Sequence, residues 1–263
     1  MKRTIFFIAI LSVVGCGPAL QNPPDTFEIT ESRIYKDTST FTFEGRKSPA
    51  WISDGFIGEH SRQIKGNVLT FTVKQSAREG GLDVGFSDVG AYVGPVSGVA
   101  DEASICSTYD IDLSGEGRWW AGPKISVNWQ GDESAKQNGE DWYENYIIEI
   151  SSSSPEELHD IFTGDYFKAE ILPDSVLAGS TYRNYKIRFH DWWQFWSVRQ
   201  DYRETGIVPL KPILNLWSDH GLPTDRRFDG VKANIETYGE ISGYGRLAVD
   251  VTDNPTKALD CAL

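Results

Sequence analysis

Residues 192–200 read WWQFWSVRQ, and residues 201–208 continue the chain as DYRETGIV. Aromatic and β-branched residues favour strands, and successive side chains of a strand point to opposite faces of a sheet. As a strand, the first segment therefore places Trp192, Gln194 and Trp196 on one face. This face combines flat aromatic rings with an amide that can hydrogen-bond, so it could line a binding cleft.

Strand patterns dominate the chain on both sides of this segment. Alternating apolar and polar residues, separated by clusters of Gly, Asp, Ser or Asn, predict strands at Thr40–Phe43, Val68–Val73, Ile125–Trp129, Tyr143–Ile150, Tyr182–Phe189, Trp193–Val198, Val231–Glu236 and Arg246–Val251. Helical spacing predicts one substantial helix over Pro209–Asp219 and a second, less regular one over Ser154–Phe162. Many strands with few helices predict an antiparallel β-sandwich in a single domain.

A glutamate stands among aromatic residues upstream of this segment. Residues 141–150 read DWYENYIIEI, and as a strand they place Trp142, Glu144 and Tyr146 on one face. Strands disfavour glutamate and its charge is costly to bury, so the position suggests a functional role. The alternative is an exposed edge position, where a glutamate is harmless.

A second glutamate follows the same pattern downstream. Residues 234–238 read NIETY, and as a strand they place Glu236 and Tyr238 on one face. The pattern leaves open whether this strand lies beside the strands of Glu144 and Gln194. Each of the three could offer a polar group amid aromatic rings to a single cleft.

These motifs and their spacing resemble glycoside hydrolase family 11, the jelly-roll xylanases. The matching segments occur in the family's order: YENYIIE (143–149) for V-E-Y-Y-I-V-E, QFWSVRQDYRETGIV (194–208) for QYWSVRQ-x-x-R-x-x-G-x-V, NLW (215–217) for N-A-W, HG (220–221) for H/Q-G, and NIETY (234–238) for A-T-E-G-Y. The resemblance covers about residues 142–251 and is specific, because several spaced motifs agree.

The resemblance implies a fold and a set of roles. The fold is all-β, a β-jelly roll of two packed, curved antiparallel sheets with one short helix and a long cleft. Residue by residue, Glu144 falls on the family's nucleophile and Glu236 on its acid/base. Positions that bind substrate or support the glutamates fall on Tyr146, Gln194, Tyr238 and, in a looser alignment, Arg188. No metal or other cofactor is implied.

Two glutamates also suit the chemistry independently of the resemblance. A retaining glycosidase needs one ionised carboxylate to attack the anomeric carbon and one protonated carboxyl to deliver a proton to the leaving oxygen, roughly 5–5.5 Å apart. Tyr146 and Gln194 would stabilise the charged form of Glu144 by donating hydrogen bonds. We therefore expect an endo-acting retaining β-glycanase of the endo-1,4-β-xylanase type, which hydrolyses xylan.

The chain departs from the family in three places. Only Phe189-His190-Asp191 separates Arg188 from Trp192, so the family's thumb hairpin with its P-S-I tip is shortened or missing. The N-terminal half matches poorly, and SVNW at 126–129 lies too close to Glu144 to be the family's own S-V-N-W strand. A polar loop, QGDESAKQNGE, is inserted at 130–140. These departures bear on the identity of the polymer more than on the fold.

The aromatic content is high, with nine Trp, eleven Tyr and thirteen Phe. Flat rings stack on sugar rings, but they also suit sandwich cores, so each tryptophan could either bind sugar or pack in the core. The tryptophans that we expect to bind substrate are Trp129, Trp142 and Trp192, with Trp119 and Trp120 as further candidates.

The first residues have the order of a secretory signal. Lys2 and Arg3 precede an apolar run, Ile5 to Val14, that is too short to span a bilayer and leads into Gly15-Cys16. We expect Cys16 to be acylated, with an ordinary signal peptide as the alternative. The expected parts are a lipoprotein signal with its acylated Cys (1–16), a tether (17–27) and a single jelly-roll catalytic domain (28–263). The protein would then be exported and lipid-anchored to a bacterial membrane, in the periplasm or at the cell surface.

The charge balance bears on partners. Without Lys2 and Arg3 the chain has 25 − 2 = 23 basic and 38 acidic residues, a net charge of −15. This argues against nucleic acid and anionic polymers, which need a cationic surface. We expect a neutral β-linked polysaccharide as partner, membrane contact only through the lipid, and a monomer. The alternatives are another β-glycan as substrate, or a non-catalytic carbohydrate-binding lipoprotein.

The two cysteines that remain after Cys16 are Cys106 and Cys261. In an oxidising compartment they could pair, and the disulfide would hold the C-terminus to the domain. The alternative is two unpaired buried thiols.

Overall fold

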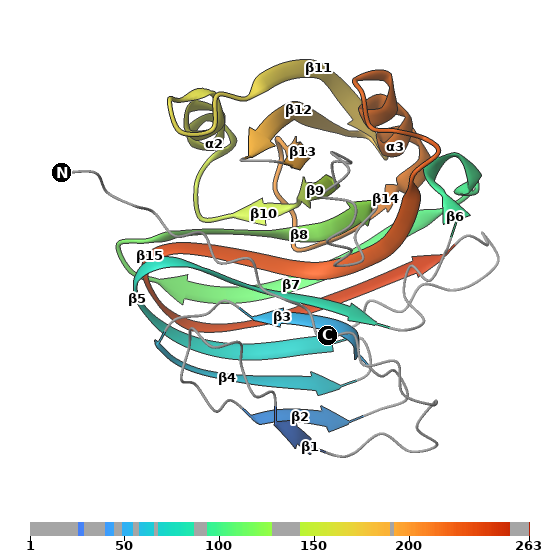
Figure 1. Cartoon of the computed structure of the whole chain (residues 1–263). Helices are drawn as coiled ribbons and strands as arrows, with labels where there is room; N and C mark the ends of the chain where they lie inside the picture. Colours follow the sequence, from blue (N-terminus) through green and yellow to red (C-terminus); the bar gives the residue numbers. More distant parts are fainter. Residues whose placement is uncertain are drawn as a thin grey trace.

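The computed structural model (Figure 1) describes residues 26–28, 40–44, 49–54, 58–65, 68–86, 94–127, 143–189, 192–252 and 263. Its strands are β1 (Thr26–Glu28), β2 (Thr40–Glu44), β3 (Pro49–Asp54), β4 (Gly58–Lys65), β5 (Val68–Phe86), β6 (Gly94–Pro95), β7 (Ser104–Ser114), β8 (Arg118–Val127), β9 (Tyr143–Ile148), β10 (Ile150–Ser151), β11 (Glu170–Leu177), β12 (Ser180–Phe189), β13 (Trp192–Arg199), β14 (Thr205–Pro209) and β15 (Arg227–Thr252). Its helices are α2 (Pro155–Thr163), α3 (Leu210–Asp219) and the short 3-10 turn η1 (Val96–Gly98).

The jelly roll has an upper layer, which includes β8, and a lower layer, which includes β7 (Figure 1). The long strand β15 belongs to both. Its first part pairs with β8, from Phe228 to Tyr238, and its second part pairs with β7, from Ser242 to Thr252. Along its other edge it pairs with β5 from Ala233 to Ala248. We expected two separate strands here, but the register shift after Gly239, whose φ is +86°, lets the chain change layer without ending the strand.

The strands of the upper layer follow the order β15-β8-β9-β13-β12-β11. Figure 1 shows these strands curling over, with α2 and α3 on opposite sides of the curl. The predicted all-β jelly roll is confirmed. Its sheets are not purely antiparallel, because β9 pairs with β13, and β2 with β4, in parallel.

The larger hydrophobic core fills the space between the layers and beneath α3. It contains, among others, Phe71, Tyr109, Ile125, Ile147, Phe195, Trp217, Ile235 and Leu247, all at most 2% exposed. The predicted helix over Pro209–Asp219 is confirmed as α3, which buries Ile213, Leu214 and Trp217. We call the side of the upper layer that faces this core the α3 face.

The second predicted helix is confirmed as α2 and packs on the opposite side, which we call the α2 face. Its start is set by a capping box, in which Ser154 Oγ accepts a hydrogen bond from Glu157 N and the Glu157 carboxylate accepts one from Ser154 N. Leu158 and Phe162, one turn apart, are fully buried. They pack with a cluster on the α2 face made of Trp120, Tyr146, Ile148, Phe167, Tyr185, Ile187, Trp196 and Val198.

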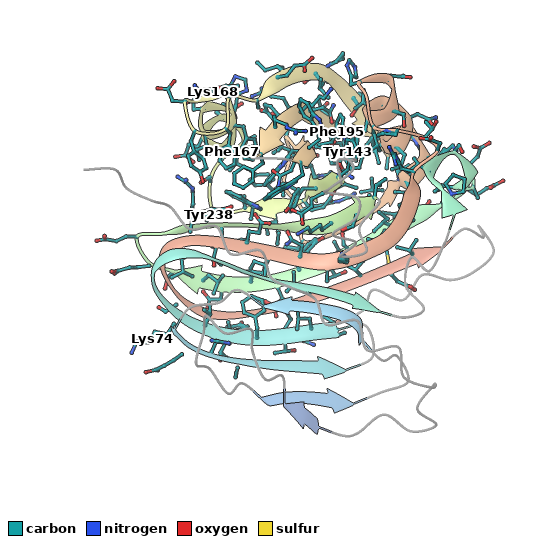
Figure 2. The ribbon with its side chains drawn as sticks, viewed as in Figure 1. Lys74, Tyr143, Phe167, Lys168, Phe195 and Tyr238 are labelled. Carbon is teal, nitrogen blue, oxygen red and sulfur yellow. The ribbon has the colours of Figure 1, made fainter. Side chains whose placement is uncertain are left out.

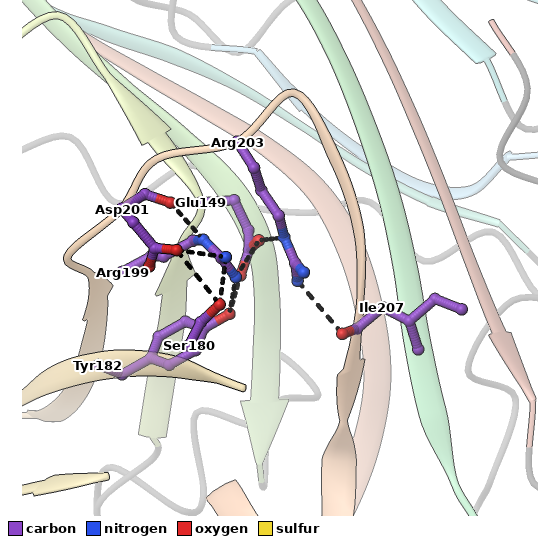
Figure 3. A network of polar contacts seen from close by, with 7 residues as sticks. All are labelled: Glu149, Ser180, Tyr182, Arg199, Asp201, Arg203 and Ile207. Atoms are coloured by element: carbon purple, nitrogen blue, oxygen red, sulfur yellow. Dashed lines mark hydrogen bonds and ion pairs between the residues drawn. The ribbon is translucent and has the colours of Figure 1, made fainter. Parts of the chain in front are cut away.

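A buried ion network links Glu149, the residue that follows β9, to residues of β12 and β13 (Figure 3). The Glu149 carboxylate is fully buried; Arg203 Nε lies 2.5 Å and Arg199 Nη1 3.9 Å from its Oε2. The Tyr182 hydroxyl donates to Glu149 Oε1 at 2.6 Å, and Arg199 also contacts Ser180 and the exposed Asp201. Burial and the nearby Glu149 charge raise the pKa of Tyr182, so its hydroxyl remains a donor.

Several expectations fall outside the described residues. These are the acylated Cys16, the tether up to residue 25, Trp129, Trp142 and Cys261; the last two tether residues, 26 and 27, lie in β1. Cys106 is disulfide-bonded, and its pairing with Cys261 stays a prediction. Among the described residues, the helices are all too short or too polar to cross a membrane.

Candidate active site

Three strands bring the predicted residues onto the α2 face. Gln194 on β13 is aligned with Glu144 on β9, so these two strands are direct neighbours. On the other side of β9, Lys124 of β8 is aligned with Tyr146. The strand of Glu236, β15, is not adjacent to β9, because β8 lies between them.

Glu144 is held by residues from its own strand and from β13. The Tyr146 hydroxyl donates to Glu144 Oε2 at 3.3 Å, and Gln194 Nε2 donates to the same oxygen at 3.5 Å. Trp196 Nε1 in turn donates to Gln194 Oε1 at 3.1 Å, which fixes the orientation of the amide. The Glu144 side chain is 14% exposed, so it can still be reached from solvent.

Lys124 completes the surroundings of Glu144, and we did not expect it from the sequence. Its Nζ lies 3.4 Å from Glu144 Oε1 and 5.1 Å from the centre of the Tyr146 ring. Its side chain is 7% exposed, so solvent screens this ion pair less than it screens a surface pair. The signal in the sequence is a single charge within the apolar strand WWAGPKISV, residues 119–127.

A second buried lysine lies beside the first. Lys232 on β15 is aligned with Lys124 and is 5% exposed, and its Nζ donates to Ser126 Oγ at 2.8 Å. Like charges directly opposite on neighbouring strands destabilise a sheet. Near Glu144, the α2 face thus carries two buried lysines, Lys124 and Lys232, in addition to the predicted glutamates.

Glu236 has its own pair of donors. Trp120 Nε1 and the Tyr238 hydroxyl each donate to Glu236 Oε2 at 3.2 Å. The rings of Trp120 and Tyr238 also contact each other, with centres 4.5 Å apart. Tyr238 therefore stands beside Glu236 as expected, whereas Trp120, a candidate for sugar stacking, is fully buried as a donor and core residue.

The two glutamates share the α2 face but are offset along it. Glu236 is aligned with Trp120 and Glu144 with Ser126, six positions apart on β8 (126 − 120 = 6). Six residues of extended strand span about 20 Å. A close approach of the two carboxyls therefore depends on the curl of the sheet.

Aromatic rings connect the two glutamates across the face. Tyr146 stacks on Trp196 at 4.2 Å between ring centres, and Trp196 meets Trp120 at 5.5 Å. Phe162 of α2 lies over this row, 4.8 Å from Trp196 and 6.0 Å from Trp120. Figure 2 shows side chains filling the space between α2 and the curled strands, with Phe167 beneath the helix. The helix thus covers the middle of the α2 face.

The remaining predicted residues separate onto the two faces. Trp192 is half-buried and, two positions before Gln194, lies on the α2 face. Arg188 lies 4.9 Å above the Trp193 ring and is aligned with that residue, on the α3 face. The expectation that Arg188 stands near Glu144 is therefore wrong, because strand alternation turns it away. Trp119 is a core residue between the layers.

Metal ligation and the attachment of α2 are two further features of the part of the chain that the structure describes. There, no group of three or more His, Cys, Asp or Glu side chains is arranged to hold a metal ion. Burial raises the pKa of Tyr185 to about 12, and its hydroxyl lies 3.0 Å from His159 Nδ1 of α2. This pair helps hold the helix on the α2 face.

Comparison with known proteins gives the fold a context. No family model matches the sequence, and no curated protein is significantly similar to it. Among solved structures, the chain is similar to the xyloglucanase domain of NopAA, a type three effector from Sinorhizobium fredii, solved in complex with cellobiose. The TM-score is 0.55 at 14% identity, over 77% of this chain and 92% of that one.

Two further structures agree. An ENZbleach xylanase mutant has a TM-score of 0.55 at 18% identity, over 76% of this chain and 79% of that one. Endoglucanase cel12A from Rhodothermus marinus has a TM-score of 0.55 at 15% identity, over 77% and 91%. Identities this low establish a shared architecture. The chain has the jelly-roll fold of these xylanases and endoglucanases.

Proposed function

We propose that this protein is a retaining endo-β-glycanase in which Glu144 is the nucleophile and Glu236 the acid/base. The observation that carries the proposal is the environment of Glu144. A carboxylate on a sheet face receives hydrogen bonds from Tyr146 and Gln194 and a charge contact from Lys124. Three donors aimed at one carboxylate hold it in a fixed orientation, which a nucleophile needs in order to attack.

In the first step, a Glu144 oxygen attacks the anomeric carbon and forms a glycosyl ester as the bond to the leaving oxygen breaks. Glu236 gives its proton to that leaving oxygen, so the first product departs as a neutral alcohol. In the second step, Glu236 takes a proton from water, the water oxygen attacks the anomeric carbon, and the Glu144 carboxylate is released. Trp120 and Tyr238 donate to Glu236 and would keep its carboxyl in place.

The two glutamates are offset along the sheet. The assignment of Glu236 as acid/base therefore requires a close approach of the carboxyls, which the assignment of Glu144 does not. The mechanism requires carboxyls roughly 5–5.5 Å apart, whereas their positions on a flat sheet would be about 20 Å apart. The curl of the upper layer has to supply this approach. Experiments on Glu236 therefore test the two-carboxylate mechanism separately from the role of Glu144.

The test is reducing-sugar release from xylan, β-1,4-glucan, mixed-linkage β-glucan and mannan by the parent, Glu144→Gln and Glu236→Gln. We expect each variant to lose activity by about a thousandfold or more, since a group that forms or breaks bonds is removed. Glu240→Gln is the matched control, because Glu240 is an exposed glutamate on the same strand as Glu236. Full activity of Glu144→Gln would refute the proposal, and full activity of Glu236→Gln would refute the acid/base assignment alone.

For the substrate, we propose xylan, from the resemblance of residues 142–251 to the xylanase motifs. The alternative is a β-1,4-glucan or a related polymer. It is favoured by the similarity to a xyloglucanase domain solved with cellobiose and to an endoglucanase. The same panel of polymers separates these outcomes, because activity on glucan alone would keep the mechanism and change the substrate.

A second function, carbohydrate binding without turnover, has one observation in its favour. Phe162 of α2 covers the aromatic row between the two glutamates. A glycan could then reach only part of the α2 face. Polymer binding by the parent with no product from any polymer would support this function over catalysis.

We also propose that the protein is exported and lipid-anchored through Cys16. The support is the order of charged, apolar and small residues in front of this cysteine. Metabolic labelling with a fatty acid tests it: Cys16→Ser should lose the label and leave the protein in the soluble fraction.

A further inference from the structure

A row of aromatic side chains continues from the Glu144 site toward the turn that follows α2. Trp192 on β13 is aligned with Phe189 on β12, and their ring centres are 5.2 Å apart. Phe189 contacts Tyr166 at 6.3 Å and Phe167 at 6.2 Å. The row thus crosses from β13 over β12 to the turn between α2 and β11.

The row lies on the same face as the proposed catalytic residues. Trp192 precedes Gln194 by two positions, and Gln194 is aligned with Glu144. Two residues of strand span about 7 Å, on the scale of a single sugar unit. A glycan chain bound at Glu144 could therefore extend onto the rings of Trp192, Phe189 and Tyr166.

The outer end of the row is open to solvent. Among the described residues, the aromatic side chains that are largely exposed are Tyr166 at 54% and Tyr244 at 42%. Tyr166 meets Phe167 at 90°, so these two rings do not cover each other face to face. Phe189 and Trp192 are half-buried. Exposed rings next to a polar site are suited to the apolar C–H faces of a sugar.

The turn that carries Tyr166 is held in place. Lys168 N donates to Gly164 O at 2.9 Å, and Ala169 N donates to Phe162 O at 2.8 Å, so the turn is tied to the end of α2. Phe167, the next side chain, is 8% exposed and packs beneath the helix, as labelled in Figure 2. The ring of Tyr166 is therefore presented on a fixed backbone, which lowers the entropy cost of binding.

We propose that Tyr166, Phe189 and Trp192 form an aromatic ledge that binds a pyranose unit of the β-glycan beyond the Glu144 site. The inference rests on the proposed function, since it assigns a further binding position for the same polymer. β12 ends at Phe189 and β13 begins at Trp192, so these two aromatic residues lie at the same end of the neighbouring strands. The ledge would hold the glycan at this end of the strands, and Tyr166 would contribute to affinity for long substrates.

The experiment measures binding of soluble xylan and of β-1,4-glucan by affinity electrophoresis, in a Glu144→Gln background that does not consume the polymer. Tyr166→Ala should weaken binding of the preferred polymer by about fivefold or more, as truncation of an aromatic binding residue does. Tyr166→Phe should bind within about twofold of the background protein, because stacking needs the ring and not the hydroxyl. Tyr244→Ala is the control for an exposed tyrosine elsewhere.

A kinetic readout separates binding from damage to the fold. With Glu144 restored, Tyr166→Ala should raise KM for the polymer with little change in kcat, and its thermal unfolding should match the parent. Unchanged polymer binding by Tyr166→Ala would overturn the ledge while leaving the proposed function standing. If the parent binds glycan but hydrolyses none, and Tyr166→Ala weakens that binding, the result would support the ledge and reject the proposed catalysis. Failure of the parent to bind any glycan would overturn both.

Discussion

Glu149→Gln is expected to destabilise the fold by about 3–5 kcal/mol, the cost of breaking a buried ion pair from one side. Glu149 is 0% exposed, and two guanidinium groups and the Tyr182 hydroxyl surround its carboxylate. The neutral amide would leave Arg203 and Arg199 without their buried counter-charge. Gln also turns an NH₂ toward donors, so at least one of these groups would lose its acceptor.

The assay is urea unfolding at neutral pH with linear extrapolation, supported by thermal unfolding. For a chain of this size the loss corresponds to roughly 6–20 °C in Tm. Asp201→Asn is the matched control: Asp201 also contacts Arg199, at 3.0 Å, but its side chain is 66% exposed, so the loss should be below about 1 kcal/mol. Equal losses in the two variants would refute the argument that burial of the charge determines the cost.

Three further predictions concern the α2 face and its packing. Phe162→Ala should cost about 3–5 kcal/mol in urea unfolding, because it empties a fully buried site against the aromatic row; a loss below 1 kcal/mol would mean that α2 packs only loosely. Gly122→Ala would place a Cβ 1.7 Å from Ile147 O and should destabilise by more than the 1–2 kcal/mol expected of Gly179→Ala, whose φ is +82° and whose Cβ would meet nothing within 4 Å. Burial raises the pKa of Tyr185 from 10.0 to about 12, so the folded state holds this proton longer than the unfolded chain, and the resulting stability is constant below pH 10 and lost between pH 10 and 12. Ultraviolet titration of phenolate absorbance in the parent and Tyr185→Phe checks this, and an early-ionising Tyr185 would contradict it.

Strand identity and helix position could be read from the sequence because they depend on local pattern. The alternation in residues 192–200 and the capping residues before α2 carry their own structural information. The contacts of Tyr146 and Gln194 with Glu144 followed from the motif order. The neighbour relation of β9 and β13 could not follow from periodicity, since pairing between strands depends on long-range packing.

The errors and omissions come from that same dependence. Arg188 was placed near Glu144 by a loose alignment, and a shift of one residue in a strand reverses the face. Lys124 and Lys232 were missed because a lysine in a strand usually lies at the surface, whereas here both are buried across from each other. The covering of the α2 face by Phe162 depends on how α2 docks, which residues 154–162 alone do not encode.

A single 26-residue strand, β15, runs through both layers and pairs with β5, β7 and β8. Neither layer can open by itself without breaking the backbone hydrogen bonds of β15. The domain should therefore behave as one cooperative unit in native-state hydrogen exchange. The amides of β15 on both sides of Gly239 would then exchange with the same free energy, that of global unfolding. Ligand binding near Glu236 should slow exchange as far away as the pairing with β7, by stabilising the whole unit.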